Sequence, residues 1–447
     1  MYIVSAGVLN LHGSADRQIH FNGSTPTLNI TWSRIVIEKN SRKNGVNISN
    51  VVISGSDAGL LIRRDGAVNI SFSRFSNNNK GVHILSENAN VAIVGSRFIN
   101  NNIGVDIVVR GKFAIFGCQF TLHHVTAIRA SRNSSRSQPE TVSISSSLFE
   151  QNNGALNLKL SYRTSLCLVK NTFMNEPEQI FASIKLTVWH SNVTIEGNTF
   201  LRFKSEALLI VANETTNIIV IRNNTWKWGK KTPLSIYYDG TYGPGTTKHT
   251  TTIENNVFHA NSGGMLLTFK GNTTARVMSN EFTENTGRAT IYVMESAIPL
   301  NISRNRFYRN VVSGVITAQS PIVISFNSFN NPQSGYDLVM FAKGVTSATY
   351  NWWGVDTRSA VAGRIQIIEN DPMIVVNFDP FLTRDPFKSC AKVANCSNHG
   401  LCVGVNTCRC DTGWLPPNCS LATCSRVNNC SGHGRCVAPN RYDDTEV

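Results

Sequence analysis

A three-residue pattern recurs along most of the chain: a small polar residue, then any residue, then an aromatic residue. It begins at Ser73-Arg74-Phe75 and ends at Asn351-Trp352-Trp353. Successive aromatic residues are separated by 22 residues (Phe98 to Phe120) up to 32 residues (Trp226 to Phe258). The aromatic members are Phe75, Phe98, Phe120, Phe149, Phe173, Phe200, Trp226, Phe258, Phe282, Phe307, Phe329 and Trp353. A pattern repeated this often indicates an array of similar structural units.

Each repeat also contains alternating apolar and polar residues just before the pattern. Val68-Asn69-Ile70 is an example, with Ile70 three positions before the small polar residue. A period of two predicts a β-strand with one buried face. A second apolar strand is expected about nine residues after the aromatic residue, with the inward members Ile84, Ile107, Leu158, Leu209, Leu267, Ile291, Ile316 and Leu338.

Two or three short strands per repeat, without a helix signal, predict an all-β fold: a right-handed parallel β-helix solenoid. We place it at residues 1–385, with twelve clear coils and one or two weaker ones over residues 28–58, where Ser33-Arg34-Ile35 fits the pattern with Ile as its third member. Coils stack at about 4.8 Å, so each position of the repeat becomes a column of like side chains. We expect Ile, Val and Phe columns in the core and a ladder of Asn amides at one corner. Residues 351–381 should cap the last coil.

Composition narrows the class of protein. The 447 residues are 41% hydrophobic and 16% charged, with a net charge of +14. The low charged fraction argues against a disordered chain, and no stretch of about 18 apolar residues predicts a membrane helix. The first residues lack the basic start and apolar core of a secretory leader. We therefore expect a segment of a longer protein, with any leader or membrane anchor outside it.

The cysteines are concentrated near the end of the sequence. Nine of the eleven lie between Cys390 and Cys436, and the first six are separated by five, five, five, one and eight residues. This spacing leaves fifteen pairings open. It matches no standard zinc pattern, and about thirty residues need cross-links because they cannot bury a sufficient core. Disulfides indicate an oxidising, extracellular compartment.

Residues 386–420 resemble an EGF-like module through Asn398-His399-Gly400, Cys408-Arg409-Cys410 and Gly413-Trp414. Residues 421–447 repeat the first half of the same pattern and are expected to form a truncated second module. The stretch before Cys390 lacks the acidic cluster of calcium-binding modules, so we expect no metal, and no other cofactor is indicated. The resemblance implies the disulfides Cys390–Cys402, Cys396–Cys408, Cys410–Cys419 and Cys424–Cys436.

The closing stretch Asn351-Trp352-Trp353-Gly354 resembles the end of pectin-lyase-like β-helix repeats in animal surface proteins, an insect tricellular-junction protein among them. That resemblance implies a role in assembling epithelial junctions. The residues themselves support a non-enzymatic extracellular scaffold that acts in cell–cell or cell–matrix contact. Its partners would be other cell-surface or matrix proteins, including further copies of the same protein, and no nucleic acid is expected outside the cell.

The main alternative is an enzyme that acts on polysaccharides, because many β-helices of this kind do. Hydrolysis of a glycosidic bond needs two carboxylates about 5–9.5 Å apart. Within residues 74–351 the Asp residues are only Asp106, Asp239 and Asp337, which should lie coils apart. His83 and Asp106 fall at equivalent positions of neighbouring coils, where we expect a solvent-facing ion pair. We therefore predict no catalytic residues.

A third alternative is a module that binds acidic glycans such as glycosaminoglycans. Residues 1–386 carry 36 basic and 24 acidic side chains, a net charge of +12, and a basic extracellular surface attracts polyanions. We select Arg304, Arg306 and Arg309 as candidate polyanion-binding residues.

Thirteen Asn-x-Ser/Thr sequons provide candidate glycosylation sites. Asn69 and Asn301 each stand one residue before the inward Ile column, so their side chains should face solvent. The selected candidates are Asn47, Asn69, Asn192, Asn272 and Asn301.

Overall fold

The computed structural model describes residues 2–5, 9–22, 32–38, 45–63, 65–86, 89–108, 111–131, 140–160, 163–177, 182–213, 216–239, 249–271, 273–294, 300–341, 343–368, 371–388, 396–397, 400–404, 407–410, 414–415 and 417–422.

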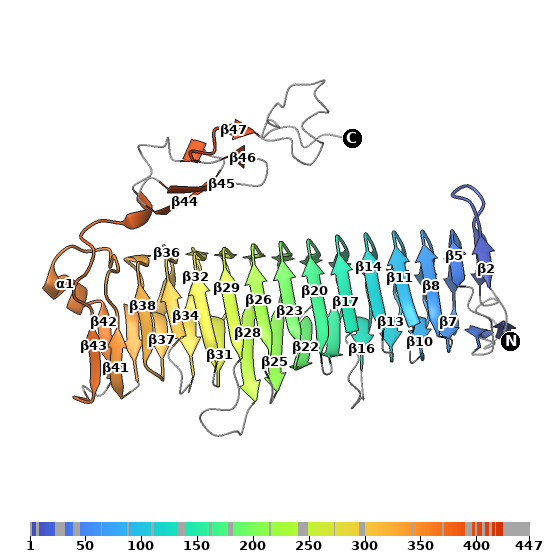
Figure 1. Ribbon diagram of the computed structural model, residues 1–447, viewed down its shortest axis with the longest axis horizontal. Helices are drawn as coiled ribbons and strands as arrows, with labels where there is room; N and C mark the ends of the chain where they lie inside the picture. The colour runs from blue at the N-terminus through green and yellow to red at the C-terminus, as the bar shows by residue number, and fades with distance from the viewer. Residues whose placement is uncertain are drawn as a thin grey trace.

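Three long parallel sheets surround one elongated core and form a solenoid (Figure 1). Sheet A contains β1 (Tyr2–Ser5), β4 (Trp32–Ile37), β7 (Ser56–Ile62), β10 (Lys80–Ile84), β13 (Ile103–Ile107), β16 (Thr126–Ala130), β19 (Leu156–Leu160), β22 (Ile184–Trp189), β25 (Leu208–Asn213), β28 (Leu234–Asp239), β31 (Met265–Lys270), β34 (Thr286–Val293), β37 (Val311–Ala318), β40 (Tyr336–Met340) and β42 (Ile365–Ile367). Sheet B contains β2 (Asn10–His12), β5 (Val46–Ser49), β8 (Gly66–Ser71), β11 (Ala89–Val94), β14 (Lys112–Phe116), β17 (Glu140–Ser145), β20 (Thr164–Val169), β23 (Asn192–Glu196), β26 (Ile218–Arg222), β29 (Thr250–Glu254), β32 (Thr274–Met278), β35 (Leu300–Ser303), β38 (Ile322–Ser325), β41 (Gly344–Ser347) and β43 (Ile374–Asn377). Sheet C contains β3 (Ile19–Asn22), β6 (Val51–Ser54), β9 (Arg74–Ser76), β12 (Arg97–Ile99), β15 (Gln119–Thr121), β18 (Leu148–Glu150), β21 (Thr172–Met174), β24 (Thr199–Leu201), β27 (Thr225–Lys227), β30 (Val257–His259), β33 (Glu281–Thr283), β36 (Arg306–Tyr308) and β39 (Ser328–Asn330).

From β1 to β39 each coil contributes one strand to each sheet in the order A, B, C, and β40 to β43 extend only sheets A and B. The predicted all-β parallel β-helix is confirmed. Strands β1 to β3 form a coil over residues 2–22, and β4 to β6 form the weaker coil expected within residues 28–58. The placement of the pattern in that second coil was wrong. Ser33-Arg34-Ile35 lies in β4 of sheet A, and Ile53 of β6 occupies the position of Phe75 in sheet C.

The aromatic residues of the pattern form one buried column along sheet C, as predicted. From Phe75 to Trp353, successive rings stack with centroids 4.6–5.0 Å apart and planes within 14° of parallel. Offset stacking of this kind stabilises aromatic pairs beyond the area that they bury.

The second apolar column of sheet A differs from the expectation in its register. Ile84 and Ile107 are aligned, but their column continues through Leu158 to Leu186 and Ile210. Leu209 faces outward and is half-buried. The later members chosen from the sequence, such as Leu267, belong to the inward column two residues earlier, because the corner between sheets C and A varies in length.

The corner between sheets B and C contains the expected polar ladder. Asn256 accepts hydrogen bonds at Oδ1 from the backbone N–H and Nδ2 of Asn224, at 2.9 and 3.0 Å, and its own Nδ2 donates to the carbonyl of Ile221. The amides of this ladder are thereby satisfied through the stack. The members are Ser73, Ser96, Cys118, Ser147, Asn171, Asn198, Asn224, Asn256, Asn280, Asn305, Asn327 and Asn351.

A second ladder, which the sequence reasoning missed, occupies the corner between sheets C and A. It lies three residues after most aromatic residues and includes Asn78, Asn101, Asn152, Asn261, Asn285, Asn310 and Asn331. His123 takes one position in it and accepts at Nδ1 from the backbone N–H of Asn101 at 3.2 Å. The three coils after that of Asn152 place Glu176, Phe203 and Gly229 there, so the ladder is interrupted in the middle of the solenoid.

The last coil is covered as expected. Trp353 is buried and stacks on Phe329 at 4.9 Å, which ends the aromatic column. The short helix α1 (Arg358–Ala362) follows, begins at the N-cap Thr357 and buries Val361 against the core. Strands β42 and β43 then extend sheets A and B by one rung each.

Beyond the solenoid, the described segments are the 3-10 helix η2 (Pro386–Lys388) and two short antiparallel pairs. These pairs join β44 (Gly400–Gly404) to β45 (Thr407–Cys410) and β46 (Trp414–Leu415) to β47 (Leu421–Ala422). Within the described residues, no helix is both long and apolar enough to cross a membrane.

Candidate functional site

The outer face of sheet A carries a cluster of ionisable side chains in which Lys80, His83 and Arg129 surround Asp106. His83, Asp106 and Arg129 are register-paired on β10, β13 and β16. Arg129 donates from Nε and Nη2 to the two carboxylate oxygens of Asp106, each at 2.8 Å. Lys80 Nζ lies 2.8 Å from Oδ2 of Asp106, and His83 Nε2 lies 3.4 Å from the same oxygen.

This cluster corrects the expectation of a solvent-facing pair between His83 and Asp106. The side chain of Asp106 is only 2% exposed, and its main partners are Arg129 and Lys80, which the sequence reasoning did not connect to it. Burial alone would raise the pKa of Asp106, but the hydrogen bonds and positive charges of Arg129 and Lys80 outweigh that effect and lower it. The carboxylate is therefore ionised and fully engaged.

His83 is a neutral acceptor at physiological pH. Burial lowers its pKa to about 4, and the charge of the neighbouring Lys80 acts in the same direction. Lys80 Nζ lies 3.3 Å from His83 Nε2. A histidine with so low a pKa is poorly matched to proton transfer near neutral pH. The cluster is thus better suited to holding the shape and charge of this face than to general acid–base chemistry.

A hollow of about 260 Å³ adjoins the cluster on the same face. It opens where Gly154 and Ala182 leave space between larger side chains, and Arg129, Asn157 and Lys185 line it. Its charged lining is basic, so an anionic or hydroxylated group would suit it better than a cation.

The other carboxylates do not join Asp106. Asp337 lies on β40, where Arg364 Nε donates to Oδ2 at 2.7 Å, and burial raises the pKa of Asp337 although Arg364 opposes the shift. Asp239 ends β28. The three Asp residues therefore lie on strands that are coils apart. Across the described ranges, no group of three or more His, Cys, Asp or Glu side chains could hold a metal ion.

Glu176, in the second ladder, is a buried carboxyl that sequence reasoning missed. It is 1% exposed, and neither oxygen has a hydrogen-bond partner of ordinary geometry among the described residues. Burial raises its pKa well above the ordinary value, and the nearby Ser183 hydroxyl opposes the shift only in part. The signal in the sequence was a Glu at the position where other coils have Asn.

The three candidate polyanion-binding arginines lie on one coil but in different settings. Arg304 is at the corner before β36, and Arg309 is at the corner after it. Arg306 Nη1 lies 3.3 Å from Glu281 Oε1, and Arg309 Nη1 lies 4.0 Å from Glu284 Oε1. Both guanidinium groups also lie 4.9 Å from the ring centre of Tyr308.

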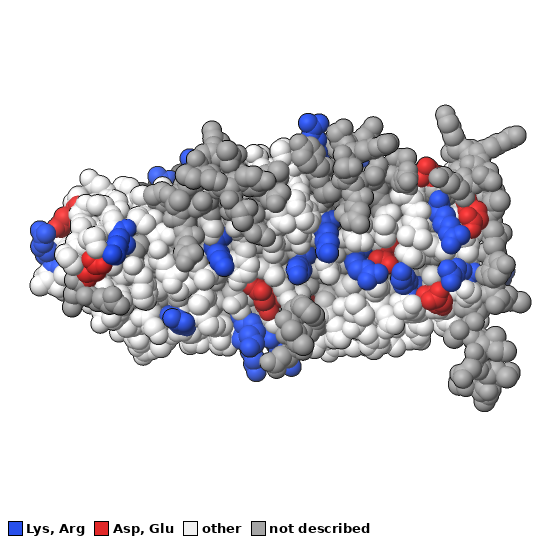
Figure 2. Space-filling model, turned by 90° about the horizontal axis from the view of Figure 1, so that it is seen from below, with Lys and Arg blue, Asp and Glu red and all other residues white. Residues whose placement is uncertain are grey.

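Acidic neighbours therefore offset part of the positive charge of that coil. The same intermixing is visible more widely, since Figure 2 shows Lys and Arg side chains separated by Asp, Glu and broad uncharged areas. The net charge of the solenoid is not gathered into one continuous basic surface on the face shown.

Four of the five glycosylation candidates face outward on sheet B, and Asn272 lies outside the described residues. Asn47 and Asn69 are register-paired, and Asn69 Nδ2 donates to Asn47 Oδ1 at 2.9 Å. Asn192 and Asn301 are exposed on β23 and β35 of the same sheet. Glycosylation of these residues stays a prediction.

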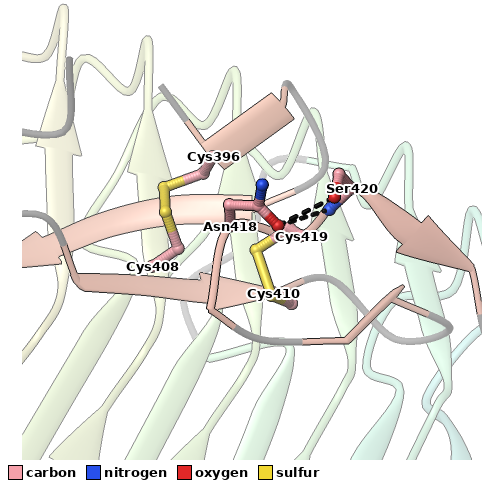
Figure 3. The surroundings of a disulfide bond; sticks show 6 residues. All are labelled: Cys396, Cys408, Cys410, Asn418, Cys419 and Ser420. Carbon is pink, nitrogen blue, oxygen red and sulfur yellow. Dashed lines mark hydrogen bonds between the residues drawn. A yellow bond between two sulfur atoms is a disulfide. The ribbon is translucent and has the colours of Figure 1, made fainter. Parts of the chain in front are cut away.

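The segment after the solenoid contains two disulfides, Cys396–Cys408 and Cys410–Cys419 (Figure 3). Asn418 Oδ1 accepts hydrogen bonds from the backbone N–H and hydroxyl of Ser420 beside the second one. Both pairs coincide with pairs that the EGF-like resemblance implies. The remaining implied pairs involve Cys390, Cys424 and Cys436, which lie outside the described residues, so Cys390–Cys402 and Cys424–Cys436 stay predictions.

Comparison with known proteins gives a family match and similarities to solved structures. No curated protein is significantly similar to the chain in sequence. Among solved structures, the chain is similar to the autotransporter UpaB from E. coli strain CFT073, with 11% identity, 84% of this chain and 94% of that chain covered, and a TM-score of 0.40. It is also similar to the periplasmic alginate epimerase AlgG, with 12% identity, 78% and 77% covered, and a TM-score of 0.28. At these values neither structure indicates what this chain does.

The family of right-handed β-helix regions matches residues 33–200 and 186–349, which together span most of the solenoid. Those two ranges include the coils from β4 to β41 that the three sheets define. The chain therefore belongs to the right-handed β-helix family.

Proposed function

We propose that this chain is a non-catalytic recognition rod of an extracellular protein, which acts in cell–cell or cell–matrix contact. The observation that carries the proposal is the unbroken stacking of the coils. The rings from Phe75 to Trp353 contact one another in series at 4.6–5.0 Å, and the polar ladder at the corner between sheets B and C runs parallel to them. A solenoid packed in this way keeps the spacing between its surface groups fixed, which suits repeated contacts with one extended partner.

The disulfides support an extracellular location. Cys396–Cys408 and Cys410–Cys419 cross-link a segment whose strands are two to five residues long. Bonds of this kind persist in oxidising compartments and are rare in the cytosol. Suitable partners are cell-surface or matrix proteins, further copies of the same protein, and acidic glycans. Resemblance of the closing segment to animal surface proteins adds epithelial junctions as the most specific setting.

Action on a polysaccharide is the rival function, and it would depend on Asp106 and His83. The geometry of the cluster weighs against it, because Arg129 and Lys80 already engage the carboxylate of Asp106. His83, with its pKa lowered to about 4, would also be a weak general base near neutral pH.

One experiment separates the two functions. Beads coated with the folded chain are mixed with epithelial cells, with matrix and with one another, and beads coated with the heat-unfolded chain serve as the control. In parallel, the soluble chain is incubated with pectate, alginate and heparan sulfate, whose chain length and uronate configuration are then measured.

We expect the folded chain to adhere to cells, matrix or itself, while each polymer stays unchanged. Shortening or epimerisation of a polymer by the wild type, lost in Asp106→Asn, would contradict the proposal. Equal adhesion of folded and unfolded chains would contradict it as well.

A further inference from the structure

Two arginines of sheet C are register partners in the coils that contain β8 and β11. Figure 1 shows these coils near the N-terminal end of the solenoid. Arg74 in β9 and Arg97 in β12 are register partners, and both side chains are exposed. Neither guanidinium takes part in an ion pair between described residues, in contrast to Arg306 at the equivalent position of a later coil, which faces Glu281. Adjacent strands are about 4.8 Å apart, so the two like charges repel each other unless an anion lies between them.

An exposed aromatic ring stands next to this pair. Phe72 occupies the corner between β8 and β9 and is 61% exposed. Its ring lies over Gly95 of the next coil, where an added Cβ would come within 2.8 Å of Cε1. Gly95 thus leaves the space that the ring occupies. An apolar ring held on the surface in this position is available for contact with a ligand.

Two hollows flank β9 and β12, one at each end of these short strands. The first has a volume of about 540 Å³ and is lined by Phe72, Arg74 and Arg97, together with Gln18 and Asn50. The second has a volume of about 520 Å³ and is lined by polar residues of the opposite corner that include Asp57, Asn77, Asn79, Asn100 and Asn102. Both volumes fall in the range of about 300–1,000 Å³ that is usual for ligand sites.

The amides of the second hollow are already ordered by one another. Asn100 Nδ2 donates to Asn77 Oδ1 at 2.7 Å, and Asn102 Nδ2 donates to Asn79 Oδ1 at 3.0 Å. Each amide has a second N–H and a second lone pair, so the row can both donate to and accept from hydroxyl groups. A row that combines amides with one carboxylate, Asp57, matches a polyhydroxylated chain better than it matches an acidic peptide.

We propose that these coils form a binding site for an acidic polysaccharide. Arg74 and Arg97 together bind a carboxylate or sulfate group, Phe72 packs against the C–H face of a sugar ring, and the amide row of the second hollow binds hydroxyl groups of neighbouring sugars. The site supplies a ligand for the recognition rod proposed above, but its chemistry does not depend on whether the chain acts in cell adhesion.

The test is a titration of the whole chain with oligosaccharides, followed by calorimetry at low and at physiological salt. The probes are oligogalacturonate, which carries carboxylates, a heparin oligosaccharide, which carries sulfates, a neutral galactan, and polyglutamate of matched charge. The variants are Arg74→Gln/Arg97→Gln, Phe72→Ala and Phe72→Trp. Lys230→Gln/Lys231→Gln removes the same charge from two exposed residues elsewhere and is the matched control.

We expect at least one acidic oligosaccharide to bind, and its identity distinguishes carboxylate from sulfate as the preferred group. Loss of the two arginines should weaken binding at least about tenfold, as expected when hydrogen bonds to charged groups are lost. Phe72→Ala should weaken it about threefold to tenfold, and Phe72→Trp should retain it. The lysine control should change affinity by less than about twofold.

Three results would overturn the site. These are no binding of either acidic oligosaccharide, equal losses in the arginine and lysine variants, or equal affinity for polyglutamate. Adhesion of beads to cells without glycan binding would be consistent with the proposed rod function and would refute only the polysaccharide site. Degradation of the bound polymer would overturn the non-catalytic rod while leaving the site intact.

Discussion

Asn256 donates hydrogen bonds from its backbone N–H and from its side-chain Nδ2 to Oδ1 of Asn280, and both are 2.9 Å long. One amide oxygen therefore satisfies two buried donors of the coil before it. The same geometry repeats in neighbouring coils, for example from Asn280 to Asn305. The corner is a continuous chain of hydrogen bonds in which each rung depends on the next.

Removal of one rung should be costly. Asn256→Ala leaves the backbone N–H and Nδ2 of Asn224 without their acceptor, and we expect a loss of about 2–4 kcal/mol in the free energy of unfolding. Asn256→Ser should lose less, since Ser occupies the same ladder at Ser73, Ser96 and Ser147. Urea unfolding measures both variants. Asn157→Ala, at an exposed position, is the control, and a loss in Asn256→Ala no larger than in that control would refute the prediction.

Gly229 and Phe203 provide a second test, of packing. A Cβ on Gly229 would lie 1.9 Å from Cζ of the buried Phe203 ring, whereas a Cβ on Gly264 would meet nothing within 4 Å. We expect Gly229→Ala to destabilise the chain by about 1–3 kcal/mol and Gly264→Ala to change stability by less than about 0.5 kcal/mol. Thermal unfolding of the two variants checks this. Similar melting temperatures would show that the packing of Phe203 does not require a glycine at position 229.

His123 should make the stability fall in mild acid. Burial lowers its pKa from 6.5 to about 4, so between these values the unfolded chain binds a proton that the folded chain does not. The free energy of unfolding therefore decreases as the pH falls from about 6.5 to about 4, by up to about 3 kcal/mol for this residue.

His123→Asn restores the residue that other coils have at this position, and it should flatten that part of the pH profile. The free energy of unfolding should still decrease somewhat with falling pH in this variant, because burial lowers the pKa of His83 to about 4 as well. Urea unfolding at pH 7 and pH 5 measures the difference. An unchanged slope in the variant would exclude His123 as its source.

Glu176 should act in the opposite direction. Its folded-state pKa lies well above the unfolded value of about 4.5, so its contribution is most favourable at low pH and is lost as the pH rises through the folded-state pKa. We expect Glu176→Gln to unfold at higher urea than the wild type at pH 8, and at nearly the same urea at pH 4. A variant that is less stable than the wild type at pH 8 would show that the buried carboxylate is favourable.

Much of the fold could be predicted because the solenoid repeats its own pattern. Phe75, Phe98 and the later aromatic residues stand at fixed distances from an alternating strand, and this fixes one inward column without knowledge of the rest. The register of sheet A could not be predicted in the same way. The corner before it varies in length, so counting from the aromatic residue placed Leu209 inside when it faces outward.

The candidate sites were less predictable, because they depend on contacts across coils. Lys80 and His83 both reach Asp106 although they are three residues apart on one strand, which a period of two does not anticipate. Arg74 was visible only as the variable middle residue of the pattern, and its importance depends on the hollow beside it. The burial of Glu176 likewise could not be predicted without knowledge of the second ladder.

The end of the solenoid has a mechanical consequence. Between β38 and β41 of sheet B, only Val323 and Ser347 are register partners. Sheet C contributes one bridge to this junction, between Ser328 and Trp352. Tension applied along the axis passes through all junctions in series, so we expect the junctions at this end, where the pairing of sheet C is reduced to one bridge, to yield first. Additional coils would lengthen the molecule without raising the force at which it breaks.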